Sequence, residues 1–354
     1  MIGLEHPIVA APMAGGASTP GLAAAVGEAG GLGFLAAGYK TPEAVREEIA
    51  AIRSLTARPF GVNVFAPPGD SDPGQVERYA ARLAEEASRL GNALGRPKHD
   101  DDGWEAKLEL VARERVPVVS FAFGCPPREV LAELREGGAE TWVTVTTPAE
   151  ARTAARAGAD ALVVQGVEAG GHRGSFDDAA PGDIGLLALL QLVRAQVDLP
   201  MIAAGGIATG AGMAAALVAG AAGVWIGTPL LSCPEGLNSP AARARVRAAS
   251  GDETVLTRAF DVAEGFAWPE RWPGRALVND FSRVWHGRED ELREDAAARQ
   301  LVIDGRRNGD PDAAPVYAGE SVGLVTSERP AGDIVRDLDA AAEKALRAVP
   351  RLLG

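Results

Sequence analysis

Eight short apolar runs recur along the first two thirds of the chain, each followed by a glycine-rich or polar turn and then by a helical pattern. The runs do not alternate in polarity, which is typical of strands buried on both faces of a parallel sheet. We expect strands at residues 7–13, 31–37, 59–65, 116–124, 141–147, 161–167, 200–206 and 221–227. Eight strands alternating with helices over about 230 residues predict an α/β fold, the (β/α)8 TIM barrel. A doubly wound parallel sheet is the structural alternative.

Start and stop signals in the intervening segments support this arrangement. Thr41-Pro42 and Thr147-Pro148 each place a capping hydroxyl before a proline suited to the first helical turn. Gly158 stands where a helix needs a left-handed stop. Helices are therefore predicted after the strands, as a barrel requires.

Two stretches exceed a minimal barrel. Residues 66–115 hold a long charged helical pattern and a second one near 103–115, which predict a helical insertion after the third strand. Residues 232–330 read as irregular, and we expect them to form a cap or substrate segment over the C-terminal face. Residues 1–231 would form the cofactor-binding barrel, completed by a returning amphipathic helix at 331–348.

Composition limits the partners and the compartment. The formal net charge of −13 disfavours nucleic acid and anionic membranes as partners. The most apolar stretch, 210–228, divides into a helix, a turn and a strand, so no membrane span is expected, and no secretory signal is recognised. The two cysteines, Cys125 and Cys233, give neither a disulfide framework nor a metal spacing, which indicates reduced thiols of a cytoplasmic protein. The oligomeric state stays open between monomer and homodimer.

Glycines follow the last two strands. Gly205-Gly206 ends the seventh strand, and Gly227-Thr228 ends the eighth. In barrels these positions bind phosphate through bare backbone N–H groups, and a threonine hydroxyl adds a donor. The alternative is that the glycines only turn the chain.

The ends of other strands suit a flat heterocycle. Small residues at 11–14 and 15–16 would let a ring lie close to the backbone, and Phe123 follows the fourth strand. Asn63 and Gln165 can hydrogen-bond the edge of such a ring, although a buried amide also serves as a structural linker. Together these residues predict flavin mononucleotide (FMN), with its phosphate over strands seven and eight and its ring across the barrel mouth.

Four segments, "APMAGG", "PFGVNVF", "GVEAGGHRG" and "AAGGIATGAGMAAALVAGAAGVWIGT", resemble the motifs of the nitronate monooxygenase family, formerly called 2-nitropropane dioxygenases. The similarity covers about residues 5–230, with a weaker echo in "ALVNDF" and "YAGESVGLV". The resemblance implies a flavoprotein oxidoreductase that binds FMN without a metal. It also implies oxidative denitrification of a small nitronate or nitroalkane by O₂.

The resemblance assigns residues by position. FMN would be held by Ala11, Pro12, Met13, Ala14, Asn63, Gln165, Ala169, Gly170, Gly171, Gly205, Gly206, Gly227 and Thr228. Phe123, Arg173, Tyr317 and Ser321 are the candidate substrate residues. Ala11 and Glu320 stand where relatives often have glutamine, and these departures leave the preferred nitronate open.

His172 is the candidate catalytic residue, because it follows the sixth strand at the open face, after two glycines that let the backbone approach the flavin. A neutral imidazole can take a proton from the carbon beside a nitro group, and a protonated one can pair with nitronate oxygens. Relatives act mainly on the preformed anion, so the favoured role for His172 is to orient the nitronate and stabilise its charge. The flavin would take one electron from the nitronate, and O₂ would then trap the radicals. The alternative for His172 is a loop-stabilising hydrogen bond. Arg173 either binds an anionic substrate or pairs with Asp177 or Asp178.

Two other functions compete with this interpretation. An FMN-dependent NAD(P)H reductase of the same barrel type, acting on an enoyl thioester or a quinone, would use a related "GGH" loop. A barrel that senses a phosphate-bearing ligand without turnover would not need His172. Weaker features are His286, expected on a solvent-facing helix, and "HDDDG" at 99–103, expected to be a solvated turn.

Overall fold

The computed structural model describes residues 3–67, 72–97, 99–177, 182–266, 268 and 272–349. Its main sheet has eight parallel strands in the order β1-β9-β8-β6-β5-β4-β3-β2. The strands are β1 (Ile8–Ala10), β2 (Gly33–Ala36), β3 (Phe60–Phe65), β4 (Val118–Ala122), β5 (Glu140–Val145), β6 (Ala161–Gln165), β8 (Met201–Ala204) and β9 (Gly223–Ile226). Each lies within one of the eight predicted runs, except that β5 begins one residue before its run.

The first and last strands in this order also bond to each other. Val9 bridges Leu32 in parallel register, Ala10 N donates to Leu32 O at 2.9 Å, and Leu32 N donates to Ile8 O at 2.9 Å. An open doubly wound sheet would leave these two edges apart. The sheet is therefore a closed (β/α)8 barrel, and the predicted fold is confirmed.

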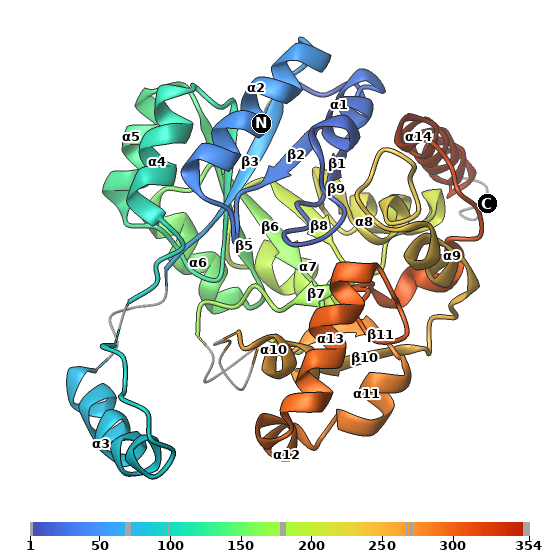
Figure 1. Cartoon of the computed structure of the whole chain (residues 1–354). Helices are drawn as coiled ribbons and strands as arrows, with labels where there is room; N and C mark the ends of the chain where they lie inside the picture. The colour runs from blue at the N-terminus through green and yellow to red at the C-terminus, as the bar shows by residue number, and fades with distance from the viewer. Residues whose placement is uncertain are drawn as a thin grey trace.

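Helices surround the barrel (Figure 1). They are α1 (Pro20–Glu28), α2 (Pro42–Leu55), α4 (Trp104–Arg113), α5 (Arg128–Glu136), α6 (Pro148–Ala157), α7 (Leu186–Arg194), α8 (Gly210–Val218) and α14 (Ala331–Ala348). The predicted caps form: Thr41 accepts from Ala44 N, and Thr147 makes a reciprocal capping box with Glu150. Gly158 ends α6 with a φ of 95°. Local signals thus fix where these helices begin and end.

The interior of the barrel is filled with aromatic rings. Phe34 lies 4.6 Å from Trp225 and 5.8 Å from Trp142, measured between ring centroids. A Cβ on Gly61 would overlap the Phe34 ring, so the neighbouring strand needs glycine there. The centre is a packed core rather than a channel, and a ligand has room only at the mouth.

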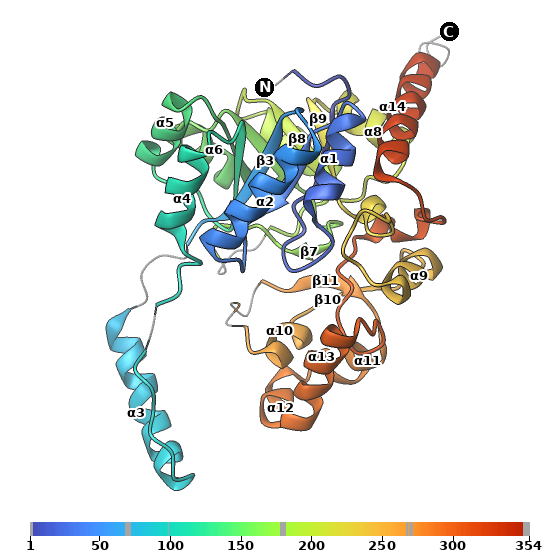
Figure 2. The ribbon, with the colours of Figure 1, turned by 45° about the horizontal axis from the view of Figure 1, so that its top comes forward.

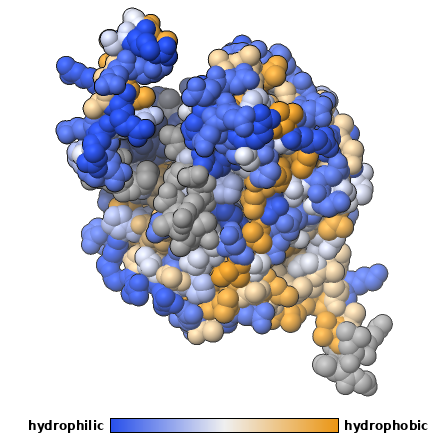
Figure 3. Space-filling view, turned by 90° about the horizontal axis from the view of Figure 1, so that it is seen from below, coloured by the Kyte–Doolittle hydropathy of each residue, from blue (hydrophilic) through white to orange (hydrophobic). Residues whose placement is uncertain are grey.

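The insertion after β3 divides into two different helices. The second of them, α4, packs onto the barrel and buries Leu110 and Val111. The first, α3 (Pro73–Arg89), buries no residue and extends away from the body (Figures 1 and 2). Its surface is mostly hydrophilic (Figure 3), and the predicted helical insertion is confirmed.

The prediction that residues 232–330 are irregular is wrong. This stretch contains α9 (Pro240–Ala248), β10 (Thr254–Thr257), α10 (Ala259–Glu264), β11 (Gly274–Leu277), α11 (Asp280–Trp285), α12 (Glu289–Glu294), α13 (Ala296–Asn308) and the 3-10 turn η2 (Glu320–Leu324). Most of these elements have only four to nine residues, which is too short for their periodicity to be clear. They pack around a small core of their own that includes Phe260, Phe281 and Val302.

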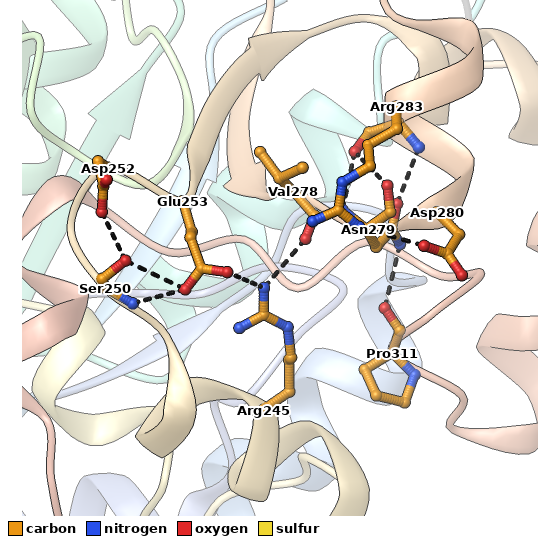
Figure 4. A network of polar contacts seen from close by, with 10 residues as sticks. Arg245, Ser250, Asp252, Glu253, Val278, Asn279, Asp280, Arg283 and Pro311 are labelled. Atoms are coloured by element: carbon orange, nitrogen blue, oxygen red, sulfur yellow. Dashed lines mark hydrogen bonds and ion pairs between the residues drawn. The ribbon is translucent and has the colours of Figure 1, made fainter.

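Polar contacts tie this segment together (Figure 4). Arg245 of α9 contacts Glu253 at 3.3 Å and the Val278 carbonyl at 3.1 Å. Asn279 caps α11 and donates to the carbonyls of Pro311 and Ala314. The "ALVNDF" segment therefore has a structural role.

The barrel and this segment share a second, three-stranded sheet in the order β10-β11-β7, where β7 is Gly171–His172. His172 pairs with Gly274, and Gly171 pairs with Arg275. The histidine expected in a loop is thus held by backbone pairing. None of the helices in the described ranges is both long and apolar enough to cross a membrane.

Candidate active site

A pocket of about 820 Å³ lies between the C-terminal ends of the barrel strands and the 232–330 segment. It is lined by every predicted cofactor residue, by His172, and by three of the four predicted substrate residues, Phe123, Tyr317 and Ser321. The cofactor candidates gathered there are Ala11, Pro12, Met13, Ala14, Asn63, Gln165, Ala169, Gly170, Gly171, Gly205, Gly206, Gly227 and Thr228. Segments far apart in the sequence therefore meet at one cavity.

The ends of β8 and β9 form a bare backbone cradle in this pocket. Gly205 has a φ of 110° and Gly206 a φ of 68°, conformations that side-chain-bearing residues rarely adopt. A Cβ on Gly205 would lie 3.0 Å from the Ala169 nitrogen. No hydrogen bond from the N–H of either glycine to another described residue is present. The cradle therefore fits an anionic group such as a phosphate.

Thr228 and Gly170 connect this cradle to the "YAGESVGLV" segment. The Thr228 hydroxyl accepts from Gly319 N at 2.9 Å, so its own proton stays available for a ligand. A Cβ on Gly170 would lie 2.6 Å from the Ala318 carbonyl carbon. Gly170 is thus required by close packing within the protein, whereas a Cβ on Gly171, which has a φ of 76°, would meet no atom within 4 Å.

The two predicted heterocycle-binding amides are engaged by the protein. Gln165 accepts from Gly174 N at 2.7 Å and donates to the His172 carbonyl at 3.2 Å, so it clamps the strand that carries the histidine. Asn63 is buried and donates to the Ser120 hydroxyl at 2.9 Å. Their geometry matches the structural-linker alternative, although both side chains still line the pocket.

His172 meets a buried carboxylate. Its Nε2 lies 2.9 Å from Oδ1 of Asp261 on α10, and the Asp261 side chain is only 3% exposed. An ionised carboxylate can only accept, so the imidazole proton resides on Nε2 and Nδ1 becomes the acceptor of a neutral ring. The other carboxylate oxygen, Oδ2, is buried and has no hydrogen-bond partner within the described ranges.

Aromatic rings flank this pair. The Trp268 ring stacks on the imidazole at 4.6 Å and 19°. The Tyr317 hydroxyl donates to Asp261 Oδ1 at 3.4 Å, and burial raises the pKa of Tyr317 well above its ordinary value. Tyr317 therefore stays a neutral donor beside the carboxylate.

Arg173 does not line the pocket. Arg173 is only 1% exposed. Its guanidinium donates to the carbonyls of Gly166, Gln165 and Gly182. Burial lowers its pKa to about 10. Arg173 thus holds its own loop and does not make the predicted contact with the substrate. Asp178, one of its two predicted acidic partners, lies outside the described residues.

Sequence reasoning missed Asp261. Its one signal is a lone aspartate among residues that are all buried in α10, namely Ala259, Phe260, Val262 and Ala263. His286 is exposed and does not line the pocket. Across the described ranges, no three His, Cys, Asp or Glu side chains gather as metal ligands would.

The family model and the curated relatives of this chain agree on one family. The family described as nitronate monooxygenase matches residues 1–340. A curated nitronate monooxygenase of Pseudomonas aeruginosa is 37% identical, with 96% of each chain covered. The solved structure of nitroalkane oxidase from Streptomyces ansochromogenes is 44% identical with a TM-score of 0.80, covering 98% of both chains. FabK from Thermotoga maritima is 31% identical with a TM-score of 0.75, covering 99% of this chain and 96% of that one.

Proposed function

This chain belongs to the nitronate monooxygenase family of oxidoreductases, and on that premise we propose that it uses FMN and O₂ to denitrify alkyl nitronates oxidatively. The observation that carries the proposal is the His172–Asp261 pair at a pocket that is also lined by a bare glycine cradle. The pair supplies a proton acceptor or a cation. The cradle supplies anion-binding N–H groups.

FMN fits the residues at the barrel mouth. The phosphate would be held by the N–H groups of Gly205 and Gly206, which make no hydrogen bond to another described residue, and by the Thr228 hydroxyl, whose own proton is available. The small residues 11–14 would let the ring lie against the backbone. When bound, FMN supplies the electron-transfer chemistry that no amino-acid side chain provides.

The chain's own residues bind and orient the substrate. His172 Nδ1 would accept the proton of a neutral nitroalkane, because Asp261 keeps the proton of the neutral ring on Nε2. With a nitronate that is already an anion, a protonated His172 would pair with its oxygens. Asp261 acts through the histidine and is a positioning residue.

We also propose the division of labour between the two parts of the chain. Residues 1–231 would bind FMN, with α14 completing the barrel wall against α8, where a Cβ on Gly210 would overlap Ala341. Residues 232–330 would form the cap, since they contribute Asp261 and Tyr317 to the pocket. The cap would exclude water from the substrate.

An absorption spectrum of the purified protein, followed by anaerobic titration, tests this function. We expect a yellow protein that releases FMN on denaturation and whose flavin absorbance is bleached by ethyl nitronate but not by NADH. Fast bleaching by NADH alone would refute the proposal in favour of the NAD(P)H reductase. A protein that stays colourless with added FMN would refute it in favour of the sensor.

A further inference from the structure

We propose that the pocket selects nitronates with an aryl or similarly broad apolar substituent over small nitronates and over nitronates that carry a carboxylate. This inference rests on the proposed function and names the substrate class of the same site. It follows from a wall of aromatic rings in the pocket that His172 also lines, from the way the backbone presents two of those rings, and from the charges around the pocket.

Four rings form a continuous wall on one side of the pocket, and we call them the aromatic wall: Tyr39, Phe65, Phe123 and Phe266. Tyr39 packs edge-on against Phe65 at 5.4 Å and stacks with Phe266 at 5.4 Å. Phe65 packs edge-on against Phe123 at 4.8 Å. These are favourable ring geometries, and a further aromatic group can join such an array.

The wall retains exposed ring surface. Tyr39 is 46% exposed and Phe266 is 42% exposed, although both line the pocket. Packing that served only to join the cap to the barrel would cover these rings. The uncovered surface is therefore available to a flat apolar ligand.

Two rings of the wall sit on unfavourable backbone. Tyr39 has a φ of 64° and Phe123 a φ of 68°, two of the four non-glycine residues in the left-handed region within the described ranges. Bulky residues avoid this region, and such outliers concentrate at binding sites. Glycine would adopt the same turn at lower cost, so the rings themselves are what these positions require.

The conformation of Tyr39 is fixed from outside the pocket. Its backbone N–H donates to Asp102 at 3.0 Å, and Asp102 forms a 2.7 Å ion pair with the fully buried Lys107 of α4. The preceding residue, Gly38, is bare because a Cβ there would overlap the Phe65 ring. The insertion after β3 thus holds one end of the aromatic wall.

The charges around the pocket disfavour a second anionic group. The lining cations are Arg306 and Arg307. Arg306 is paired with Glu264 and donates to the Gly15 carbonyl at 3.0 Å, and Arg307 lies 3.6 Å from Asp304. Within the described ranges each lining arginine therefore already has an acidic partner, while Asp261 adds a buried negative charge. A carboxylate-bearing nitronate would therefore have to compete with these acidic partners, and Arg307 is the weaker-paired of the two arginines, its side chain being 73% exposed.

Steady-state oxidation of three nitronates by the FMN-loaded enzyme tests the inference: phenylnitromethane nitronate, ethyl nitronate and propionate 3-nitronate. We expect the highest kcat/KM for the aryl compound and the lowest for the carboxylate. In Phe123→Leu and Phe266→Leu, kcat/KM for the aryl nitronate should fall about two- to tenfold per ring, the range of one aromatic contact. The value for ethyl nitronate should fall by a clearly smaller factor, because its substituent offers no ring to pack against the wall.

Tyr79→Leu is the matched control, because Tyr79 is an exposed aromatic residue on α3, outside the pocket. It should leave all three values unchanged. If kcat/KM falls equally for aryl and ethyl nitronates in the wall variants, the wall serves only to pack the cap against the barrel, and the inference is overturned. A higher kcat/KM for ethyl nitronate or the carboxylate compound in the native enzyme would also overturn it. If no nitronate is oxidised at all, the proposed function itself fails.

Discussion

Asp261→Asn is the change that most directly tests how the site works. The Asp261 side chain is 3% exposed, and among the described residues it accepts hydrogen bonds from His172 Nε2 at 2.9 Å and from the Tyr317 hydroxyl at 3.4 Å. Asparagine keeps the size but can present an amide N–H₂ to Nε2. The imidazole proton would then move to Nδ1, which could no longer accept a proton from the substrate.

The size of the effect follows from this geometry. An imidazolium and a carboxylate 2.9 Å apart attract by about 6 kcal/mol at an effective dielectric constant of 20. Desolvation of both groups offsets part of that attraction, so we take a net loss of about 3–4 kcal/mol. This corresponds to about 10²–10³-fold in the rate of proton abstraction, and the equivalent change in a serine protease costs about 10⁴-fold. A preformed nitronate needs no proton abstraction, so its turnover should fall by a smaller factor, which reflects only the weaker charge pairing of a His172 that has lost its carboxylate partner.

The assay compares neutral nitroethane with ethyl nitronate as substrates of the same preparation, with bound FMN measured by absorbance. Asp280→Asn is the control, because Asp280 is a cap aspartate whose side chain is 86% exposed. It should change neither substrate's turnover. Equal losses on both substrates in Asp261→Asn, with FMN retained, would refute the assignment of Asp261 as the residue that sets the proton position.

Three further outcomes are expected. His172→Asn should keep bound FMN and lower nitronate turnover about 10–10²-fold, because the nitronate loses a charge-assisted hydrogen bond worth about 1.5–3 kcal/mol; unchanged turnover in steady-state kinetics would overturn the role of the imidazole. Gly205→Ala, at a φ of 110°, should lower the free energy of unfolding by about 1–2 kcal/mol and weaken FMN binding in a fluorescence titration. Gly95→Ala is the control, because a Cβ there meets nothing within 4 Å; it should change neither the free energy of unfolding nor the affinity for FMN. Equal FMN affinity in the two variants would contradict the proposal that Gly205 helps to bind the phosphate. Burial raises the pKa of Cys125 from 9.0 to about 11. The fraction of Cys125 present as thiolate at pH 8 should therefore be about a hundredfold lower in the folded protein than in the unfolded chain. The rate of reaction with DTNB measures this in a Cys233→Ala background, and an equal rate before and after unfolding in urea would contradict the prediction.

The strands and helix ends of the barrel could be predicted because their causes are local. The run at 141–147 consists of β-branched and aromatic residues, which favour a strand wherever the run lies, and Thr147 caps the next helix through atoms three residues away. By contrast, β7 has two residues and is a strand only because β11 pairs with it. No local pattern could reveal it.

The candidate site divides along the same line. Residues on the strand ends, such as Gly205 and Thr228, were predicted to share a pocket because a barrel brings all its strand ends to one face. The partners of individual polar groups were not predictable. Gln165 holds the histidine strand and Arg173 holds its own loop, because their hydrogen-bond partners are backbone atoms whose positions only folding defines.

By itself, the sequence determined the barrel, the face on which the site lies and the histidine at its edge, because hydrophobic periodicity, capping and glycine positions act over a few residues. Tertiary structure alone decided that Asp261, 89 residues further along the chain, would meet His172, and that rings from four separate segments would line one wall. Contacts of this kind depend on how the cap docks on the barrel. That docking follows from the burial of many small surfaces at once, and no single stretch of the chain encodes it.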